Sequence, residues 1–119
     1  MQNFTLYQKI DDMSNYLFPV VERFPKSEKF ALCTQIKNCV HTMIMNVIRM
    51  QKIHPKNIRE KLRWARETDC RLEMLQHFIR HAHSRRYLSN KRLRLITEKL
   101  VELGRIIGGL IRRFSGAHS

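Results

Sequence analysis

The sequence is poor in cysteine and contains no long apolar run. Its three cysteines, Cys33, Cys39 and Cys70, are an odd number and show no Cys-x-x-Cys spacing. We therefore expect three reduced thiols in a cytoplasmic protein. No apolar stretch approaches the ~18–20 residues that cross a bilayer, and residues 1–12 lack the basic and apolar regions of a signal peptide. A basic amphipathic helix can also lie on a membrane surface, but several such helices pack more simply on each other, so we expect no membrane partner.

Catalytic and metal-binding motifs are also missing. The sequence has no Gly-x-Ser-x-Gly motif, no phosphate-binding glycine loop and no carboxylate dyad, so we expect neither an enzyme nor a small-molecule substrate. His77 and His81 are four residues apart and His83 follows, and two histidines at that spacing can share a metal ion. Only Glu73, one turn before His77, is a further ligand close in sequence. We therefore expect no metal site and no cofactor.

Acidic residues are scarce relative to basic ones. The chain holds 23 Lys and Arg but only 10 Asp and Glu, which gives a formal net charge of +13. Residues 1–54 carry 7 basic and 4 acidic side chains, a net of +3, whereas residues 55–119 carry 16 and 6, a net of +10. Charge concentrated in one half favours a polyanionic partner, most often nucleic acid. The alternative is a soluble basic protein without such a partner.

What the sequence does contain is apolar residues at helical spacing. In residues 91–114 they recur every three or four positions, and basic residues occupy the other side of the same helix. Ser27 and Ser89 are expected N-caps, and Pro55 is expected as the first residue of a helix. The four such patterns predict helices at about residues 3–23, 27–51, 56–83 and 90–114.

Short connections between amphipathic helices make sequential helices run antiparallel. With no strand pattern and no internal repeat, we predict one domain, residues 1–119, that forms an all-α, up-down-up-down antiparallel four-helix bundle. Trp64, Phe78, Leu95 and Ile106 lie off the main inward-facing lines. Because exposed apolar patches usually mark contact sites, we expect a closed homo-oligomer, such as a dimer or a ring.

Individual positions within the helices carry further expectations. Phe30 belongs to the apolar stripe of the second predicted helix, and Cys70 is expected to be packed. Gly104, Gly108 and Gly109 lie inside the last helix, where each glycine costs roughly 1 kcal/mol relative to alanine. Small residues four apart allow another backbone to approach closely, which is the simplest explanation for them.

Basic residues recur along the third helix and continue into the next connection and helix. We expect antiparallel packing to bring them to one end of the bundle, where guanidinium groups bind phosphate oxygens bidentately. The alternative is a solvated face of ion pairs, in which Glu60, Glu67 and Glu73 each pair within one turn. No zinc-finger, ribonucleoprotein or helix-turn-helix signature indicates readout of bases. The candidate nucleic-acid-binding residues, which are RNA-binding residues if the partner is RNA, are Arg59, Arg63, Arg66, Arg80, Arg85, Arg86, Lys91, Arg92, Arg94, Arg105 and Arg112.

Two segments resemble one family of small bacterial four-helix-bundle proteins. Tyr-Leu-Phe-Pro at 16–19, followed by Phe-Pro-Lys-Ser-Glu-Lys-Phe at 24–30, resembles the family's first turn region. Leu-Gly-Arg-Ile-Ile-Gly-Gly-Leu-Ile at 103–111 resembles its C-terminal glycine signature, which often ends in Trp where this chain has Leu110. The family includes proteins encoded within intervening sequences of ribosomal RNA genes and the accessory variability determinant (Avd) of diversity-generating retroelements. The strong basic charge favours the second group.

The resemblance implies a cytoplasmic, non-enzymatic pentamer shaped like a barrel, encoded by a bacterium or a phage. Such a protein binds the retroelement's reverse transcriptase together with template-repeat and adjacent RNA, and it supports mutagenic cDNA synthesis. Arg80 matches a position where the family tends to carry arginine, and Arg105 belongs to the glycine signature. The alternatives are an interaction protein of the intervening-sequence type and a basic DNA-binding regulator.

Overall fold

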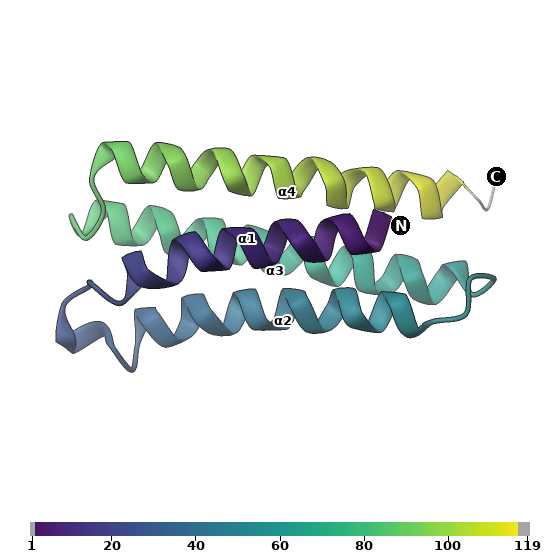
Figure 1. The fold of residues 1–119 in the computed structure, drawn as a ribbon, viewed down its shortest axis with the longest axis horizontal. Helices are drawn as coiled ribbons and strands as arrows, with labels where there is room; N and C mark the ends of the chain where they lie inside the picture. The colour runs from purple at the N-terminus through teal and green to yellow at the C-terminus, as the bar shows by residue number, and fades with distance from the viewer. Residues whose placement is uncertain (1, 117–119) are drawn as a thin grey trace.

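The computed structural model describes residues 2–116, and within that range it contains four α-helices, one 3-10 turn and no strand. The four helices lie side by side with alternating directions (Figure 1), and the body that they form measures 47 × 24 × 19 Å. The prediction of an all-α fold with four helices is confirmed. No helix in this range combines the length and the apolar character needed to cross a bilayer. The elements are α1 (Gln2–Val21), η1 (Lys26–Glu28), α2 (Leu32–Lys52), α3 (Ile58–Ser84) and α4 (Asn90–Gly116).

The core runs along the whole length of the bundle. The helices pack in the cyclic order α1, α2, α3, α4, and α4 closes the cycle against α1. Buried residues of α3 and α4 alternate in steps of three and four, which is the spacing that lets side chains of neighbouring helices interdigitate. These residues are Ala65, Thr68, Leu72, Leu75, Ile79 and Ala82 in α3, and Ile96, Leu100, Leu103, Ile107, Leu110 and Phe114 in α4.

Two predicted helix starts are wrong. The second long helix begins at Leu32 instead of residue 27, because residues 26–28 form the separate turn η1, and Ser27 therefore does not cap it. The third begins at Ile58, and its N-cap is Asn57, whose side-chain oxygen accepts a hydrogen bond from the backbone N–H of Glu60 at 3.3 Å. Pro55 therefore lies in the connection before the helix.

The predicted N-cap of the fourth helix is confirmed. The Ser89 hydroxyl oxygen accepts a hydrogen bond from the backbone N–H of Arg92 at 3.1 Å, immediately before α4 begins at Asn90. This bond satisfies one of the N–H groups that a helix start leaves without a partner. The capping serine therefore fixes where the fourth helix starts.

Two residues that were predicted to be packed are exposed. Phe30 is 87% exposed, because α2 starts two residues later and Phe30 lies in the connection before it. Cys70 is also exposed, whereas Cys33 and Cys39 are buried, and all three are free thiols. Burial raises the pKa values of the Cys33 and Cys39 thiols, so both are poor nucleophiles at neutral pH.

The glycines of α4 have room for a methyl group within one chain. A Cβ on Gly104 would lie 3.6 Å from Cδ2 of Leu72, and one on Gly108 would lie 3.5 Å from Nη1 of Arg112, both ordinary contacts. Across the described residues, no backbone atom of another helix lies within 4 Å of either position. The expected close approach of a second backbone is therefore absent within this bundle.

We expect Gly108→Ala to raise the free energy of unfolding by about 0.5–1 kcal/mol, because alanine restricts the unfolded chain and favours the helix. The only close neighbour is the mobile end of the Arg112 side chain, which can move aside. Denaturant unfolding followed by circular dichroism measures the change. A loss of stability would contradict the prediction and would indicate a close neighbour from another chain.

Candidate nucleic-acid interface

The predicted RNA-binding residues lie at both ends of the bundle, so the expectation that they gather at one end is wrong. Because α3 and α4 run in opposite directions, the start of each helix lies beside the end of the other (Figure 1). At 1.5 Å per residue, Arg59 and Arg80 are about 30 Å apart along α3. We call the end formed by the connections 22–31 and 85–89 the turn end, and the end at connection 53–57 the opposite end.

The turn end carries exposed cations that have no acidic partner. Arg92 is half-buried, and its Nη1 donates to the Tyr16 hydroxyl at 3.5 Å. Five further predicted residues lie at this end. None of them forms a salt bridge with a residue in the range 2–116, so their positive charge faces solvent. These five are Arg80, Arg85, Arg86, Lys91 and Arg94.

The opposite end is partly neutralised. Arg63 lies 3.8 Å from the Glu60 carboxylate, and its guanidinium carbon lies 5.1 Å from the centre of the Trp64 ring. Arg105 lies near the middle of α4, where Glu102 is paired with Lys9 at 2.7 Å. The pKa of Glu102 is lowered mainly by the hydrogen bond from Lys9 and only in small part by Arg105. The remaining predicted residues at this end, Arg59, Arg66 and Arg112, are exposed.

The alternative of a solvated face of ion pairs describes part of α3. Glu60 pairs with Arg63, and Glu67 pairs with Arg71 at 3.2 Å, as predicted. Glu73 forms no salt bridge with any residue that the structure describes. Exposed pairs of this kind contribute little stability, about 0–1 kcal/mol each, but they reduce the positive potential at the opposite end and at the middle of α3.

The two connections at the turn end are joined by side chains. The Tyr87 hydroxyl donates a hydrogen bond to the Glu28 carboxylate at 2.9 Å, and the ring of Tyr87 lies 5.4 Å from the ring of Phe24. The hydrogen bond to Glu28 is the main reason why the pKa of Tyr87 is raised. These contacts hold the α1–α2 connection against the α3–α4 connection, so that their basic residues share one surface.

Arg86 holds an unfavourable backbone conformation at this end. Its φ is 64°, and it is the only non-glycine residue in the described chain with a positive φ. Its N–H donates to the carbonyl of His83 and the N–H of Tyr87 donates to that of Ala82, each at 2.9 Å. This pair of bonds forms a Schellman motif, in which glycine is the usual residue at the position of Arg86.

We expect Arg86→Gly to raise the free energy of unfolding by about 1 kcal/mol, because glycine adopts positive φ without the steric cost that arginine carries. If Arg86 binds a phosphate, the same change weakens RNA binding. The slope of log affinity against log salt concentration then becomes less steep by about 0.7–0.9. Denaturant unfolding and a salt titration of RNA binding measure the two effects. Arg86→Lys retains the charge and is the matched control. A lower stability of the glycine variant would contradict the prediction.

Lys26 and Lys29 also belong to the turn end, and the sequence interpretation missed them as binding residues. Both are exposed, and neither forms a salt bridge with a residue in the described part of the chain. The signal for them was the alternation of basic residues with Phe24 and Phe30, which is common in surfaces that bind nucleic acid. The turn end therefore holds more unpaired cations than the sequence interpretation included.

The histidines of α3 do not assemble a metal centre within residues 2–116, where no group of three or more candidate ligands lies together. The ring of His77 lies 5.8 Å from the ring of Phe78. Nε2 of His83 lies 2.7 Å from the side-chain oxygen of Asn90. That contact connects the end of α3 to the start of α4.

A family model described as bAvd-like matches residues 4–114, which include both segments on which the resemblance depends and nearly all of the four helices. No curated protein matches the chain.

Proposed function

Because this chain belongs to the bAvd-like family, we propose that it is a non-catalytic accessory protein of a diversity-generating retroelement. It binds the reverse transcriptase and the template-repeat RNA, and it supports mutagenic copying of that RNA into cDNA. Within the fold, the observation that carries the RNA-binding part is the set of turn-end cations without acidic partners. In α3, α4 and the connection between them, that set consists of Arg80, Arg85, Arg86, Lys91 and Arg94.

The proposed mechanism is electrostatic positioning. A guanidinium group that forms no salt bridge with a carboxylate can form bidentate hydrogen bonds with phosphate oxygens. Contacts of this kind fix the register and orientation of a nucleic acid but carry no sequence information. Specificity for one RNA therefore comes from its shape and from the polymerase bound beside it. The protein holds the template against the polymerase and leaves the chemistry to the enzyme.

We also propose that the protein acts as a homo-oligomer, a pentameric ring in the cytoplasm. Large apolar side chains remain outside the core: Met45 is 48% exposed, Met74 46% and Val101 43%. Surfaces of this kind usually mark contact sites between proteins. A ring repeats the turn end in every subunit, so that several weak phosphate contacts act together on one long RNA.

The test is affinity purification of the tagged protein from its native host, followed by sequencing of the bound RNA and identification of the bound proteins. We expect a reverse transcriptase and one structured non-coding RNA. Recovery of bulk RNA that dissociates in salt, without a polymerase, would contradict the proposal. That result would favour an interaction protein of the intervening-sequence type.

A further inference from the structure

The pocket beside Phe30 is an apolar site at the turn end that the proposed phosphate contacts do not use. Phe30 is the most exposed large apolar side chain among the described residues, at 87%. Together with Phe24 and Pro25 it lines a pocket of about 530 Å³, and Lys26 and Lys29 lie at the same pocket. That volume falls within the roughly 300–1,000 Å³ of pockets that hold small-molecule ligands.

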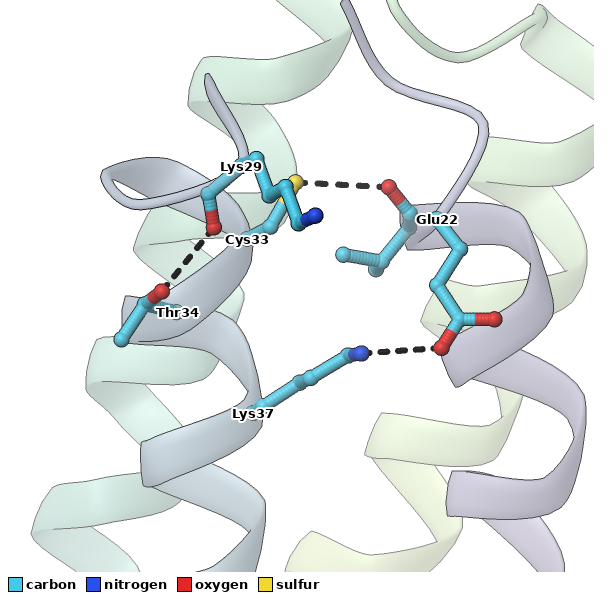
Figure 2. Close-up of polar contacts among 6 residues, drawn as sticks. Glu22, Lys29, Cys33, Thr34 and Lys37 are labelled. Atoms are coloured by element: carbon cyan, nitrogen blue, oxygen red, sulfur yellow. Dashed lines mark hydrogen bonds and ion pairs between the residues drawn. The ribbon is translucent and has the colours of Figure 1, made fainter. Parts of the chain in front are cut away.

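The contacts around the pocket fix its backbone and leave Lys26 and Lys29 without a carboxylate partner among the described residues. The Lys37 ammonium lies 2.9 Å from the Glu22 carboxylate (Figure 2), so these two charges neutralise each other. The Thr34 hydroxyl donates to the Lys29 carbonyl at 3.0 Å, and the Cys33 thiol donates to a carbonyl of α1 at 3.4 Å. These bonds hold the connection in place on both sides of Phe30, while the Lys29 ammonium lies 5.4 Å from the Phe30 ring centre.

The pocket adjoins the basic residues of the α3–α4 connection. Phe24 lines the pocket and also contacts the Tyr87 ring. Glu28, in the turn between Lys26 and Lys29, accepts the Tyr87 hydroxyl hydrogen bond at 2.9 Å. Arg86 precedes Tyr87 in the chain, so the cations of both connections border one surface, and the pocket beside Phe30 lies on it.

We propose that this pocket binds an unpaired nucleotide of the RNA, with its base stacked on Phe30 and its phosphates bound by Lys26 and Lys29. The inference rests on the proposed function and adds the kind of RNA element that the turn end binds. An aromatic ring among unpaired cations is the arrangement that proteins use for single strands. The bases of a duplex are stacked inside the helix and cannot reach such a ring. The neighbouring arginines then hold the phosphates on either side of the unpaired nucleotide.

The experiment compares a short fluorescein-labelled oligouridine with a blunt RNA duplex of the same length, using Phe30→Ala and Phe30→Trp. We expect Phe30→Ala to weaken oligouridine binding by about 5- to 100-fold and to leave duplex binding within about twofold. The salt dependence of Phe30→Ala should match that of the unmodified protein, because no charge is removed. Phe30→Trp should restore oligouridine binding, and its fluorescence should be quenched by oligouridine more than that of the unmodified protein, which contains only Trp64.

A matched pair of variants separates stacking from charge. In the double variant with Lys26→Ala and Lys29→Ala, the slope of log affinity for oligouridine against log salt concentration should become less steep by about 1.4. Each phosphate contact on a single strand contributes about 0.7 to that slope. Phe30 lies in an exposed connection, so Phe30→Ala should unfold at the same denaturant concentration as the unmodified protein.

The outcomes distinguish this inference from the proposed function. If the unmodified protein binds neither RNA, both are wrong. If it binds both RNAs and Phe30→Ala changes neither affinity, or lowers both equally, only the stacking site is wrong. If Phe30→Ala removes capture of the polymerase while RNA binding is unchanged, the pocket is a protein-docking site and the stacking proposal is overturned.

Discussion

Replacement of the five unpaired turn-end cations in α3, α4 and the connection between them by alanine should weaken binding to structured RNA roughly 100- to 1,000-fold at physiological salt. Each exposed charge contact contributes up to about 1 kcal/mol, and five of them act on the same RNA. The slope of log affinity against log salt should become less steep by about 3.5–4.5, since each phosphate contact contributes about 0.7–0.9. Filter binding or fluorescence anisotropy across a salt series measures both. The changed residues are Arg80, Arg85, Arg86, Lys91 and Arg94.

The matched control removes the same number of charges from the opposite end and from the middle of α4. Its expected loss of affinity is below about tenfold, because these residues lie outside the proposed binding surface at the turn end. Of the five, only Arg63 forms a salt bridge within the described residues, with Glu60 at 3.8 Å. Equal losses in the two variants would mean that binding depends on net charge alone. A larger loss in the control would place the binding surface at the opposite end. The control residues are Arg59, Arg63, Arg66, Arg105 and Arg112.

The interior of the fold could be predicted from the sequence because burial follows a simple period. The apolar residues that recur every three or four positions in residues 91–114 include Ile96, Leu103 and Ile107, and all three are at most 1% exposed. The period defines the angle of each residue around its helix. It therefore predicts which side chains are buried without any knowledge of neighbouring helices.

Connections were harder to predict, because their structure depends on contacts between distant residues. Phe30 continues the apolar spacing of α2, but η1 and the Glu28–Tyr87 hydrogen bond fix a turn there. That hydrogen bond joins residues 59 positions apart, so no local pattern reveals it. Asn57 and Pro55 are both reasonable helix starts, and only the structure distinguishes them.

The sequence contained enough information to predict that the basic residues lie at both ends of the bundle, but we predicted that they gather at one end. Steps of three and four place Arg59 and Arg80 on related sides of α3, and they say nothing about distance along the axis. The 1.5 Å rise per residue supplies that distance, and a helix of 27 residues is long enough to separate its two ends by about 40 Å. What the sequence could not supply was which cations are already paired, since the Lys9–Glu102 ion pair joins α1 to α4.

The core of α3 should be the most sensitive part of the fold to substitution. Leu75 is 0% exposed and lies near the middle of α3, the helix that packs against both α2 and α4. Leu75→Ala should lower the free energy of unfolding by about 2–5 kcal/mol, because it removes buried apolar surface and leaves a cavity. The total free energy of unfolding of a domain is only about 5–15 kcal/mol. Denaturant unfolding should therefore show the change clearly.

Leu95→Ala makes the same chemical change at a residue that is 36% exposed. In a monomer it should cost less than about 1 kcal/mol, because little apolar surface is lost from the core. If Leu95 instead lies between subunits of the proposed ring, its loss should lower stability more at low protein concentration than at high concentration. Leu75→Ala should lower stability equally at every concentration if it acts only through the core. Similar costs for the two variants, independent of concentration, would contradict the assignment of Leu75 to the core and Leu95 to the surface.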